Sequence, residues 1–256
     1  MTGRKTRVIL AGASGRMGRT IGTRFVEDGI VELVAGFDPV NQDPVVGYIP
    51  IAESFDALPD NLEADLVLDF STAEAAEGNI IKYLENGLDV IIGATGFDES
   101  DKLKFAGLAE KFKKRIVLVP NFTPGANLLM KFARDAARVF KNIEIIEMHH
   151  DRKIDAPSGT ALHTAAMVNE SGSRGAPPTP SDRSRGRIEG NVPVHAVRLP
   201  GLLAHQEILC GSEGEVLTIR HDTTDRSAFL SGIYLAIEKL PNLKPGFTTG
   251  LEWAFD

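Results

Sequence analysis

The stretch 147–162, EMHHDRKIDAPSGTAL, gathers side chains that could transfer protons or bind an anion. His149 or His150 could act as a general acid, because imidazole titrates near neutral pH. Lys153 is a second candidate proton donor, or a cation for a substrate carboxylate. These residue types together predict proton transfer to a negatively charged substrate.

The second half of this stretch predicts the start of a helix. Ser158 is a candidate N-cap, and the Gly159 and Thr160 amides would then open the helix as an anion-binding site. Thr160 adds a hydroxyl group. The alternative is a polar loop that leads into an ordinary capped helix.

A metal site is not expected here, although two histidines are adjacent. The segment before them alternates like a strand, so their side chains are expected on opposite faces. The stretch has no H-E-x-x-H pattern, and Cys210 is the single cysteine of the chain, so zinc is not expected. We expect one imidazole to transfer protons and the other to bind substrate.

A glycine-rich loop near the N-terminus predicts a dinucleotide site. In LAGASGRMGRTI (10–21) the glycines follow G-x-x-G-x-x-G, in place of the more common G-x-G-x-x-G. The loop leaves an apolar run and enters a helical segment, where backbone amides can approach a pyrophosphate. We expect it to line the cofactor through Gly12, Ala13, Ser14, Gly15, Arg16 and Met17. The alternative is a strand–helix turn without a ligand.

Asp38 bears on the choice of cofactor. It ends the second predicted strand, where a carboxylate can accept both ribose hydroxyls of the adenosine. A carboxylate there repels a 2′-phosphate, Pro39 offers no positive charge, and Arg16 offsets the repulsion only in part. We therefore expect NADH to be used at least as well as NADPH.

The first half of the chain alternates apolar runs with helical segments. Strands are expected over 7–12, 31–37, 64–70, 89–95 and 115–120, with helices over 16–28, 73–86 and 99–113. Continuous Val, Ile and Leu runs are typical of strands covered on both faces, and this alternation predicts a Rossmann-like parallel sheet. Ligands in such sheets bind beyond the carboxyl ends of the strands, so GATG (93–96) and PNFTPGAN (120–127) should lie around the nicotinamide.

The pattern changes after residue 122. The segment 142–150 alternates, and three further strand-like segments follow 190 with only short connections, which predicts an antiparallel or mixed sheet in an α+β domain. The stretch 171–187, rich in Ser, Gly, Pro and Arg, is expected to be a mobile loop. A helix over 227–240 should follow Asp225 as its N-cap.

The composition excludes several classes of function. The chain has 256 residues, a net charge of −7 and 43% hydrophobic residues. An acidic balance disfavours nucleic acid and anionic membranes as partners, though not a small anionic substrate. Because no apolar run reaches about 18 residues and no signal-peptide core is present, we expect a soluble, cytoplasmic protein.

Several segments together resemble one enzyme family. LAGASGRMG, GATGF, PNFTPGAN, EMHHDRKIDAPSGTAL and RLPGLLAHQEILCG occur in the order typical of dihydrodipicolinate reductases, the 4-hydroxy-tetrahydrodipicolinate reductases of lysine and diaminopimelate biosynthesis. The resemblance implies a dinucleotide-binding domain over 1–122, completed by a return over 227–256, and a substrate-binding and oligomerisation domain over 123–226. It also implies a homotetramer that reduces a cyclic dicarboxylate with NADH or NADPH.

The resemblance assigns roles residue by residue. It implies hydride transfer to C4 of the substrate ring, with His149 as proton donor or acceptor and Lys153 as proton donor. Substrate would be bound by His150, Ser158, Gly159 and Thr160. Beyond the glycine loop and Asp38, the cofactor site would include Gly93, Ala94, Thr95, Val119, Pro120, Asn121 and Phe122. Pro39 departs from family members with Arg at this position, which weakens a preference for NADPH.

Two other functions remain open from the sequence. One is a non-catalytic protein that senses NAD(H), which would keep the glycine loop and Asp38 but has no need of 147–160. The other is a different NAD-dependent dehydrogenase of amino-acid metabolism, such as an aspartate or homoserine dehydrogenase.

Overall fold

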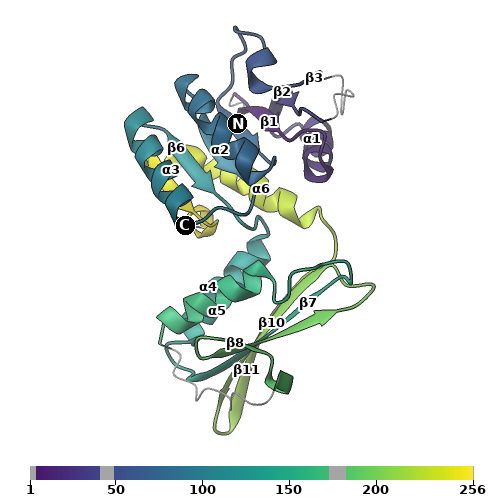
Figure 1. Ribbon diagram of the computed structural model, residues 1–256, viewed down its shortest axis with the longest axis vertical. Helices are drawn as coiled ribbons and strands as arrows, with labels where there is room; N and C mark the ends of the chain where they lie inside the picture. The colour runs from purple at the N-terminus through teal and green to yellow at the C-terminus, as the bar shows by residue number, and fades with distance from the viewer. Residues whose placement is uncertain (1–3, 41–48, 173–182, 256) are drawn as a thin grey trace. The chain divides into compact units, whose positions relative to one another are not determined.

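The computed structural model describes residues 4–40, 49–172 and 183–255, which form two compact units. One unit comprises Met1–Phe122 with Gly232–Asp256, and the other comprises Thr123–Ser231 (Figure 1). The C-terminal return was predicted to begin at residue 227; in the structure it joins the first unit at Gly232, inside a helix. The roles assigned to the two domains stay a prediction.

The first unit contains a seven-stranded parallel sheet in the order β12-β6-β5-β4-β1-β2-β3. Its strands are β1 (Arg7–Ala11), β2 (Glu32–Phe37), β3 (Ile51–Ala52), β4 (Leu66–Asp69), β5 (Asp89–Ile92), β6 (Arg115–Leu118) and β12 (Gly246–Thr249). From β1 the chain adds β2 and then β3 on one side, and afterwards β4, β5 and β6 in turn on the other side of β1. The strand order therefore reverses beside β1, where open parallel sheets bind their ligands.

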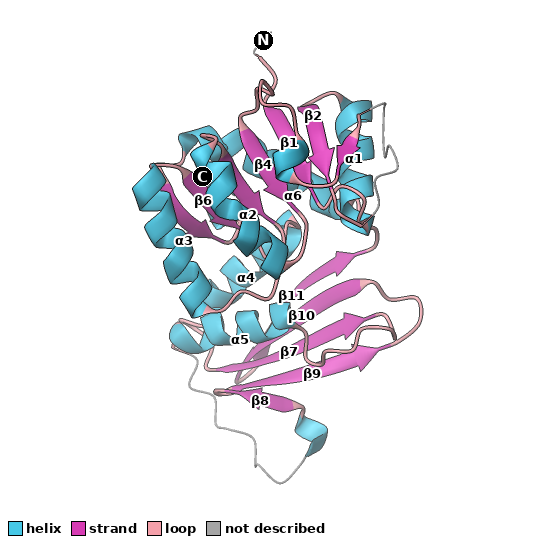
Figure 2. Cartoon of the chain, turned by 45° about the horizontal axis from the view of Figure 1, so that its top comes forward, coloured by secondary structure: helices cyan, strands magenta, loops and turns pink. Residues whose placement is uncertain are grey.

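Helices cover both faces of this sheet. They are α1 (Arg16–Asp28), α2 (Ala73–Glu85), α3 (Glu99–Phe112) and most of α6 (Ala228–Lys239), with short 3₁₀ turns at Phe55–Ala57, Leu240–Asn242 and Glu252–Phe255. Right-handed crossovers in the two opposite directions along the sheet put α1 on one face and α2 and α3 on the other. The ring of Tyr234 on α6 packs against Phe25 of α1, so α6 shares the α1 face (Figure 2).

The central strands are apolar because both of their faces are covered. In β1, Val8, Ile9, Leu10 and Ala11 are all at most 2% exposed. Burial of such side chains contributes about 1.5–3 kcal/mol for each large residue. The first half is thus the parallel-sheet domain predicted from its continuous apolar runs.

The second unit is a five-stranded mixed sheet in the order β11-β10-β7-β9-β8, with two helices. Its elements are α4 (Pro124–Ala136), β7 (Asn142–His149), α5 (Gly159–Glu170), β8 (Arg187–Glu189), β9 (Val192–Arg198), β10 (Ala204–Ser212) and β11 (Glu215–Thr223), with a 3₁₀ turn at Arg183–Arg185. The strands β7 and β9 are parallel, whereas the other pairs are antiparallel. Ile143, Ile145 and Ile208 pack with residues of α4 and α5 in the core of this unit.

The structure differs from the predicted elements in a few places. The strands β3, β8 and β12 and the helix α4 were not predicted. Of the expected loop 171–187, residues 173–182 lie outside the described residues, and Arg187 already belongs to β8. Within the described ranges, no helix is long and apolar enough to cross a membrane.

Candidate active site

The residues predicted to bind a dinucleotide lie at the carboxyl edge of the parallel sheet. Gly12–Met17 follow β1, Asp38 follows β2, Gly93–Thr95 follow β5, and Val119–Phe122 follow β6. Since parallel strands end at one edge, these four segments converge there. The strands β5 and β6 end before residues 93 and 119, so both segments are loops, as a ligand site at this edge requires.

The glycine loop fits a dinucleotide. Gly12 has φ +69, and a Cβ atom there would lie 2.7 Å from the Phe70 carbonyl group. A Cβ atom at Gly18 would lie 2.2 Å from the Gly12 oxygen, so α1 packs against the loop only with glycine at that position. The N-cap of α1 is Gly15, which provides no side-chain hydrogen bond to the first-turn amides. Such a helix start is suited to a pyrophosphate.

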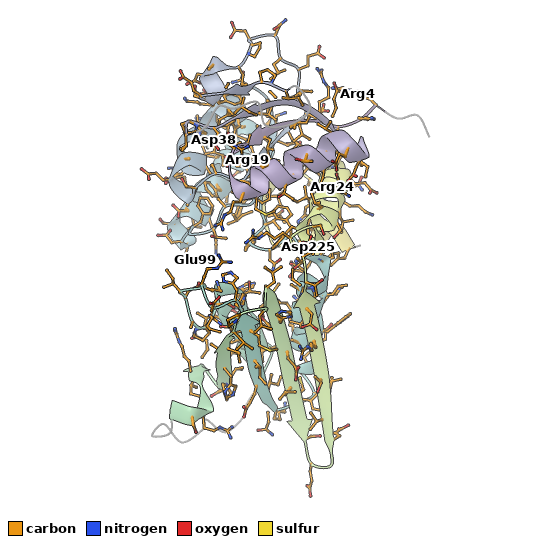
Figure 3. The ribbon with its side chains drawn as sticks, turned by 90° about the vertical axis from the view of Figure 1, so that its right-hand side faces the viewer. Arg4, Arg19, Arg24, Asp38, Glu99 and Asp225 are labelled. Atoms are coloured by element: carbon orange, nitrogen blue, oxygen red, sulfur yellow. The ribbon has the colours of Figure 1, made fainter. Side chains whose placement is uncertain are left out.

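Asp38 is held against this loop. Its side chain is buried, and its two oxygens accept hydrogen bonds from the Ser14 amide at 3.1 Å and the Val40 amide at 3.0 Å. The Arg19 guanidinium donates to the Ser14 carbonyl at 2.9 Å; Asp38 and Arg19 are both labelled in Figure 3. A carboxylate has about four acceptor positions, so Asp38 retains capacity for the two hydroxyls of a ribose.

Phe70 is a residue of this edge that the sequence did not single out. Its backbone blocks a side chain at Gly12, and a Cβ atom at Gly93 would lie 2.5 Å from its ring. The ring also packs against Phe122, with centroids 5.3 Å apart. Phe70 therefore contacts three of the four cofactor segments. Asp69 before it is buried, which raises the pKa of its carboxyl, and hydrogen bonds from Ser71 and Tyr83 hold that carboxyl in place.

The second unit contains a pocket of about 440 Å³ lined by the predicted catalytic residues. Its walls are His149, His150, Arg152, Lys153, Ile154, Asp155, Leu203, Ala204, Thr223, Arg226 and Phe229. The lining includes three Lys or Arg residues and one carboxylate, and this positive balance suits an anionic ligand. Arg152 and Arg226 were not predicted, since neither belongs to a motif that signals anion binding on its own.

The two histidines line this same pocket, which corrects the expectation that they occupy opposite faces. The physical reason is that β7 ends at His149, so strand alternation does not extend to His150. Within the described residues, the buried Nδ1 atom of His150 has no hydrogen-bond partner. An unsatisfied buried polar atom costs about 1–3 kcal/mol, so a polar ligand or water is expected there.

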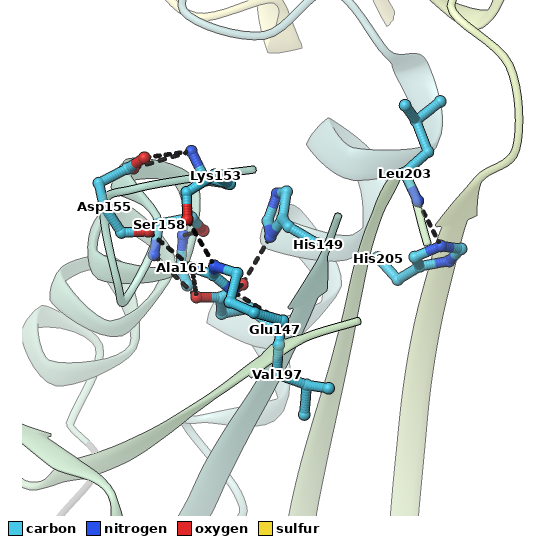
Figure 4. Close-up of polar contacts among 10 residues, drawn as sticks. Glu147, His149, Lys153, Asp155, Ser158, Ala161, Val197, Leu203 and His205 are labelled. Carbon is cyan, nitrogen blue, oxygen red and sulfur yellow. Dashed lines mark hydrogen bonds and ion pairs between the residues drawn. The ribbon is translucent and has the colours of Figure 1, made fainter. Parts of the chain in front are cut away.

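His149 and Lys153 each bind a carboxylate (Figure 4). The His149 Nδ1 atom lies 2.5 Å from Glu147 Oε2. The Lys153 ammonium donates to both Asp155 oxygens at 2.7 and 2.8 Å. These hydrogen bonds lower the pKa of Asp155 by more than its burial raises it, so the pKa lies below its usual value. One of the three ammonium donors of Lys153 is left for a ligand.

Ser158 is the N-cap of α5, as predicted. Its hydroxyl accepts the Ala161 amide at 3.2 Å. In the described chain the Gly159 and Thr160 amides have no acceptor, which leaves two donors at the helix start. Ser158, Gly159 and Thr160 do not line the pocket of His149 and Lys153. They belong to the same segment, which begins at the end of β7.

Over 4–40, 49–172 and 183–255, no group of three or more His, Cys, Asp or Glu side chains is arranged to hold a metal ion.

Comparison with protein families gives two adjoining matches. Residues 6–122 match the model described as dihydrodipicolinate reductase, N-terminus, and residues 125–252 match dihydrodipicolinate reductase, C-terminus. Together they cover nearly the whole chain.

Individual relatives agree with this match. A 4-hydroxy-tetrahydrodipicolinate reductase of Moorella thermoacetica is 40% identical over 96% of both chains, and one of Bacillus pumilus is 38% identical over 95% of this chain and 96% of its own. A solved structure, dipicolinate-bound dihydrodipicolinate reductase from a Paenisporosarcina species, has a TM-score of 0.86 at 35% identity and covers 97% of this chain and 99% of that chain.

A more distant likeness concerns the fold alone. Aspartate dehydrogenase from Thermotoga maritima has a TM-score of 0.52 at 17% identity, covering 94% of this chain and 97% of its own. This level of identity gives no ground for transferring its activity.

Proposed function

The chain belongs to the dihydrodipicolinate reductase family, and from this premise we propose that His149 delivers the proton and Lys153 binds and polarises the substrate. Membership makes the chain an NAD(P)H-dependent 4-hydroxy-tetrahydrodipicolinate reductase of lysine and diaminopimelate biosynthesis. It is therefore an enzyme, and neither a non-catalytic NAD(H) sensor nor a dehydrogenase of another amino-acid pathway.

The proposed cofactor site is the carboxyl edge of the parallel sheet. The glycine loop would hold the pyrophosphate, Asp38 the ribose, and Gly93–Thr95 with Val119–Phe122 the nicotinamide half. When bound, NAD(P)H supplies the hydride for the reduction. The support is the fit described above: an uncapped helix start, a glycine cradle and a buried carboxylate with acceptor capacity left.

NADH is proposed to be used at least as well as NADPH. Asp38 would repel a 2′-phosphate. Pro39 follows it, and the segment from 39 to 48 contains no Lys or Arg in the sequence. Arg16 begins α1 and is exposed, so it would offset the repulsion only partly.

The substrate is proposed to bind through its two carboxylates. Two features support this proposal. One is the cationic pocket at His149, His150 and Lys153. The other is the start of α5, where the amides of Gly159 and Thr160 have no acceptor. Ser158 would keep these amides in place as the helix cap. The Paenisporosarcina relative, whose structure is described as dipicolinate-bound, gives a planar dicarboxylate as a suitable probe.

In the proposed reaction, one C–H bond forms at C4 of the ring from hydride and one forms at the neighbouring carbon from a proton. Protonated His149 donates from Nε2, since its Nδ1 is engaged by Glu147. The electron pair of the reduced double bond takes up this proton, and His149 is left neutral. The Lys153 ammonium stabilises the negative charge that develops on the substrate before the proton arrives.

Steady-state oxidation of NADH, dependent on added 4-hydroxy-tetrahydrodipicolinate, tests these roles. His149→Gln and Lys153→Ala are each expected to lower kcat by roughly 100-fold or more, because a positioned general acid and a preorganised charge that stabilises the transition state each contribute about that much. The affinity for NADH, measured by fluorescence titration, should stay within about twofold. Near-normal turnover in both variants would refute the assignment.

We also propose a homotetramer assembled through the face of the mixed sheet away from α4 and α5. Val197 and Val216 lie on strands of this sheet and are 38% and 70% exposed, which is unusual for apolar side chains of a free sheet face. Light scattering should give about four times the 27.7 kDa chain mass. A monomeric mass at micromolar concentration would exclude the tetramer.

A further inference from the structure

Glu147 is a buried carboxylate that connects the proton donor to the rest of the second unit. Its side chain is 0% exposed. It accepts hydrogen bonds from His149 Nδ1 at 2.5 Å, from the Ser158 amide at 3.0 Å, and from both terminal nitrogens of Arg198 at 2.7 and 2.8 Å. Glu147 is therefore bonded to the proposed proton donor, to the cap of the proposed substrate-binding helix, and to Arg198.

The charge state of Glu147 determines where the proton of His149 lies. Burial raises the pKa of Glu147, but hydrogen bonds from His149 and Arg198 outweigh this and bring the pKa below its usual value. Glu147 is therefore ionised at neutral pH, and an ionised carboxylate can only accept. The hydrogen between the two groups must then reside on Nδ1 of His149, which leaves Nε2 as the atom that exchanges a proton.

Arg198 extends the connection to the segment that carries Lys153. It pairs in register with His149 between the parallel strands β9 and β7. Besides its two bonds to Glu147, it donates to the Asp155 carbonyl at 2.6 Å and to the Lys153 carbonyl at 3.3 Å. One guanidinium thus holds both the carboxylate behind His149 and the backbone that presents Lys153.

We propose that the buried Glu147–Arg198 pair is the positioning device of this active site: Glu147 fixes His149 with its Nδ1 protonated and Nε2 available to the substrate, and Arg198 fixes the Lys153–Asp155 backbone. Neither residue is placed against the substrate, so both act through others. The inference deepens the proposed function and rests on it, because it requires His149 to be the proton donor.

Substitutions of the two residues are expected to change different kinetic parameters. Glu147 acts on the chemistry, since its hydrogen bond to Nδ1 selects the tautomer of His149 and orients its ring. Arg198 acts mainly on binding, since it anchors the backbone of the substrate segment. The other charged or titratable groups at His149 are His150, Arg152, Lys153, Asp155 and Arg226, which line the same pocket and remain unchanged in every variant below.

The first measurement is steady-state kinetics of Glu147→Gln and Arg198→Lys. Glu147→Gln is expected to lower kcat by at least about tenfold, and at most near the 10⁴-fold seen where an amide replaces the carboxylate behind a catalytic histidine. Arg198→Lys should mainly raise KM for the dicarboxylate, with NADH affinity unchanged.

The matched control is Glu144→Gln on the same strand. Glu144 also pairs with a histidine, His195, at 2.8 Å, and with Arg185. Residues 144 and 147 lie on opposite faces of β7 because side chains alternate along a strand. Glu144→Gln should leave kcat and KM for the dicarboxylate within about twofold of the unchanged enzyme.

A double-mutant cycle distinguishes the failure of this inference from failure of the proposed function. If Glu147 works through His149, Glu147→Gln should lower kcat no further in a His149→Gln background. An additive loss, or a loss from His149→Gln alone with normal kcat in Glu147→Gln, overturns the inference and leaves the proposed function intact. Normal kcat in His149→Gln overturns the proposed role of His149 as proton donor.

A second measurement needs no change at Glu147, so it does not depend on whether Glu147→Gln folds. In the ¹⁵N-labelled enzyme above the titration of His149, its ring resonances, identified by their loss in His149→Gln, should indicate hydrogen on Nδ1 and none on Nε2. The opposite tautomer would contradict the inference directly.

Discussion

At the scale of residues, the motif around His149 predicted the proposed proton transfer, but not Glu147 and Arg198, which are proposed to position His149 and Lys153. His149, His150 and Lys153 line one pocket, and Ser158 caps α5. Glu147 and Arg198 escaped notice because they meet through a strand pairing, and the register between β7 and β9 is not visible in a linear motif. A charged residue inside a strand indicates a buried ion pair only when its partner across the sheet is known.

The choice of cofactor is also a property of single residues, and it gives a prediction. Pro39→Arg should raise kcat/KM for NADPH relative to NADH by about tenfold or more, because a guanidinium binds a 2′-phosphate with paired hydrogen bonds. Pro39 is exposed beside buried Asp38, so the new side chain has room. Initial rates with the two cofactors at fixed substrate measure the ratio.

The control for this change adds the same charge elsewhere. Leu103 on α3 is 75% exposed, and Leu103→Arg should leave the NADPH/NADH ratio as it was. If both variants shift the ratio equally, the effect is one of overall charge, and the account of Asp38 and Pro39 does not hold.

At the scale of elements, the apolar runs predicted the strands and helices of the first unit almost to their ends. The expected helices 16–28, 73–86 and 99–113 correspond to α1, α2 and α3. The missed strands of this unit are short or lack an apolar pattern: β3 has two residues, and β12 reads GFTT. Their pairing with β2 and β6 places them in the sheet, and such long-range pairing cannot be read from a local pattern.

The turn between β1 and α1 leads to a second prediction. Gly12→Ala should weaken NADH binding by about tenfold or more and lower the melting temperature, since positive φ costs a residue with Cβ about 1–2 kcal/mol before any clash. Here the clash is with the Phe70 backbone at 2.7 Å, which cannot rotate away. Calorimetric titration with NADH and thermal unfolding measure the two effects.

The chain offers a matched glycine for comparison. Gly78 lies inside α2, and a Cβ atom there would meet nothing within 4 Å. Gly78→Ala should stabilise the protein by about 0.5–1 kcal/mol through helix propensity, without effect on NADH binding. Equal behaviour of Gly12→Ala and Gly78→Ala would contradict the proposed role of the loop.

At the scale of the whole molecule, the proposed functions are divided between the two units. The parallel-sheet unit carries the glycine loop and Asp38, while the mixed-sheet unit carries His149 and Lys153. The sequence indicated this division through the change of pattern near residue 122. It did not indicate where the C-terminal segment leaves one unit for the other, because α6 is a continuous helix across that boundary.

The binding of the dicarboxylate is the central claim, and a crystal structure of the complex with NADH and dipicolinate tests it most directly. The account predicts one dipicolinate carboxylate within hydrogen-bonding distance of Lys153 Nζ and the other on the Gly159 and Thr160 amides, with the Glu147–His149 hydrogen bond retained. Dipicolinate bound away from all three of these groups, or His149 detached from Glu147, would contradict it.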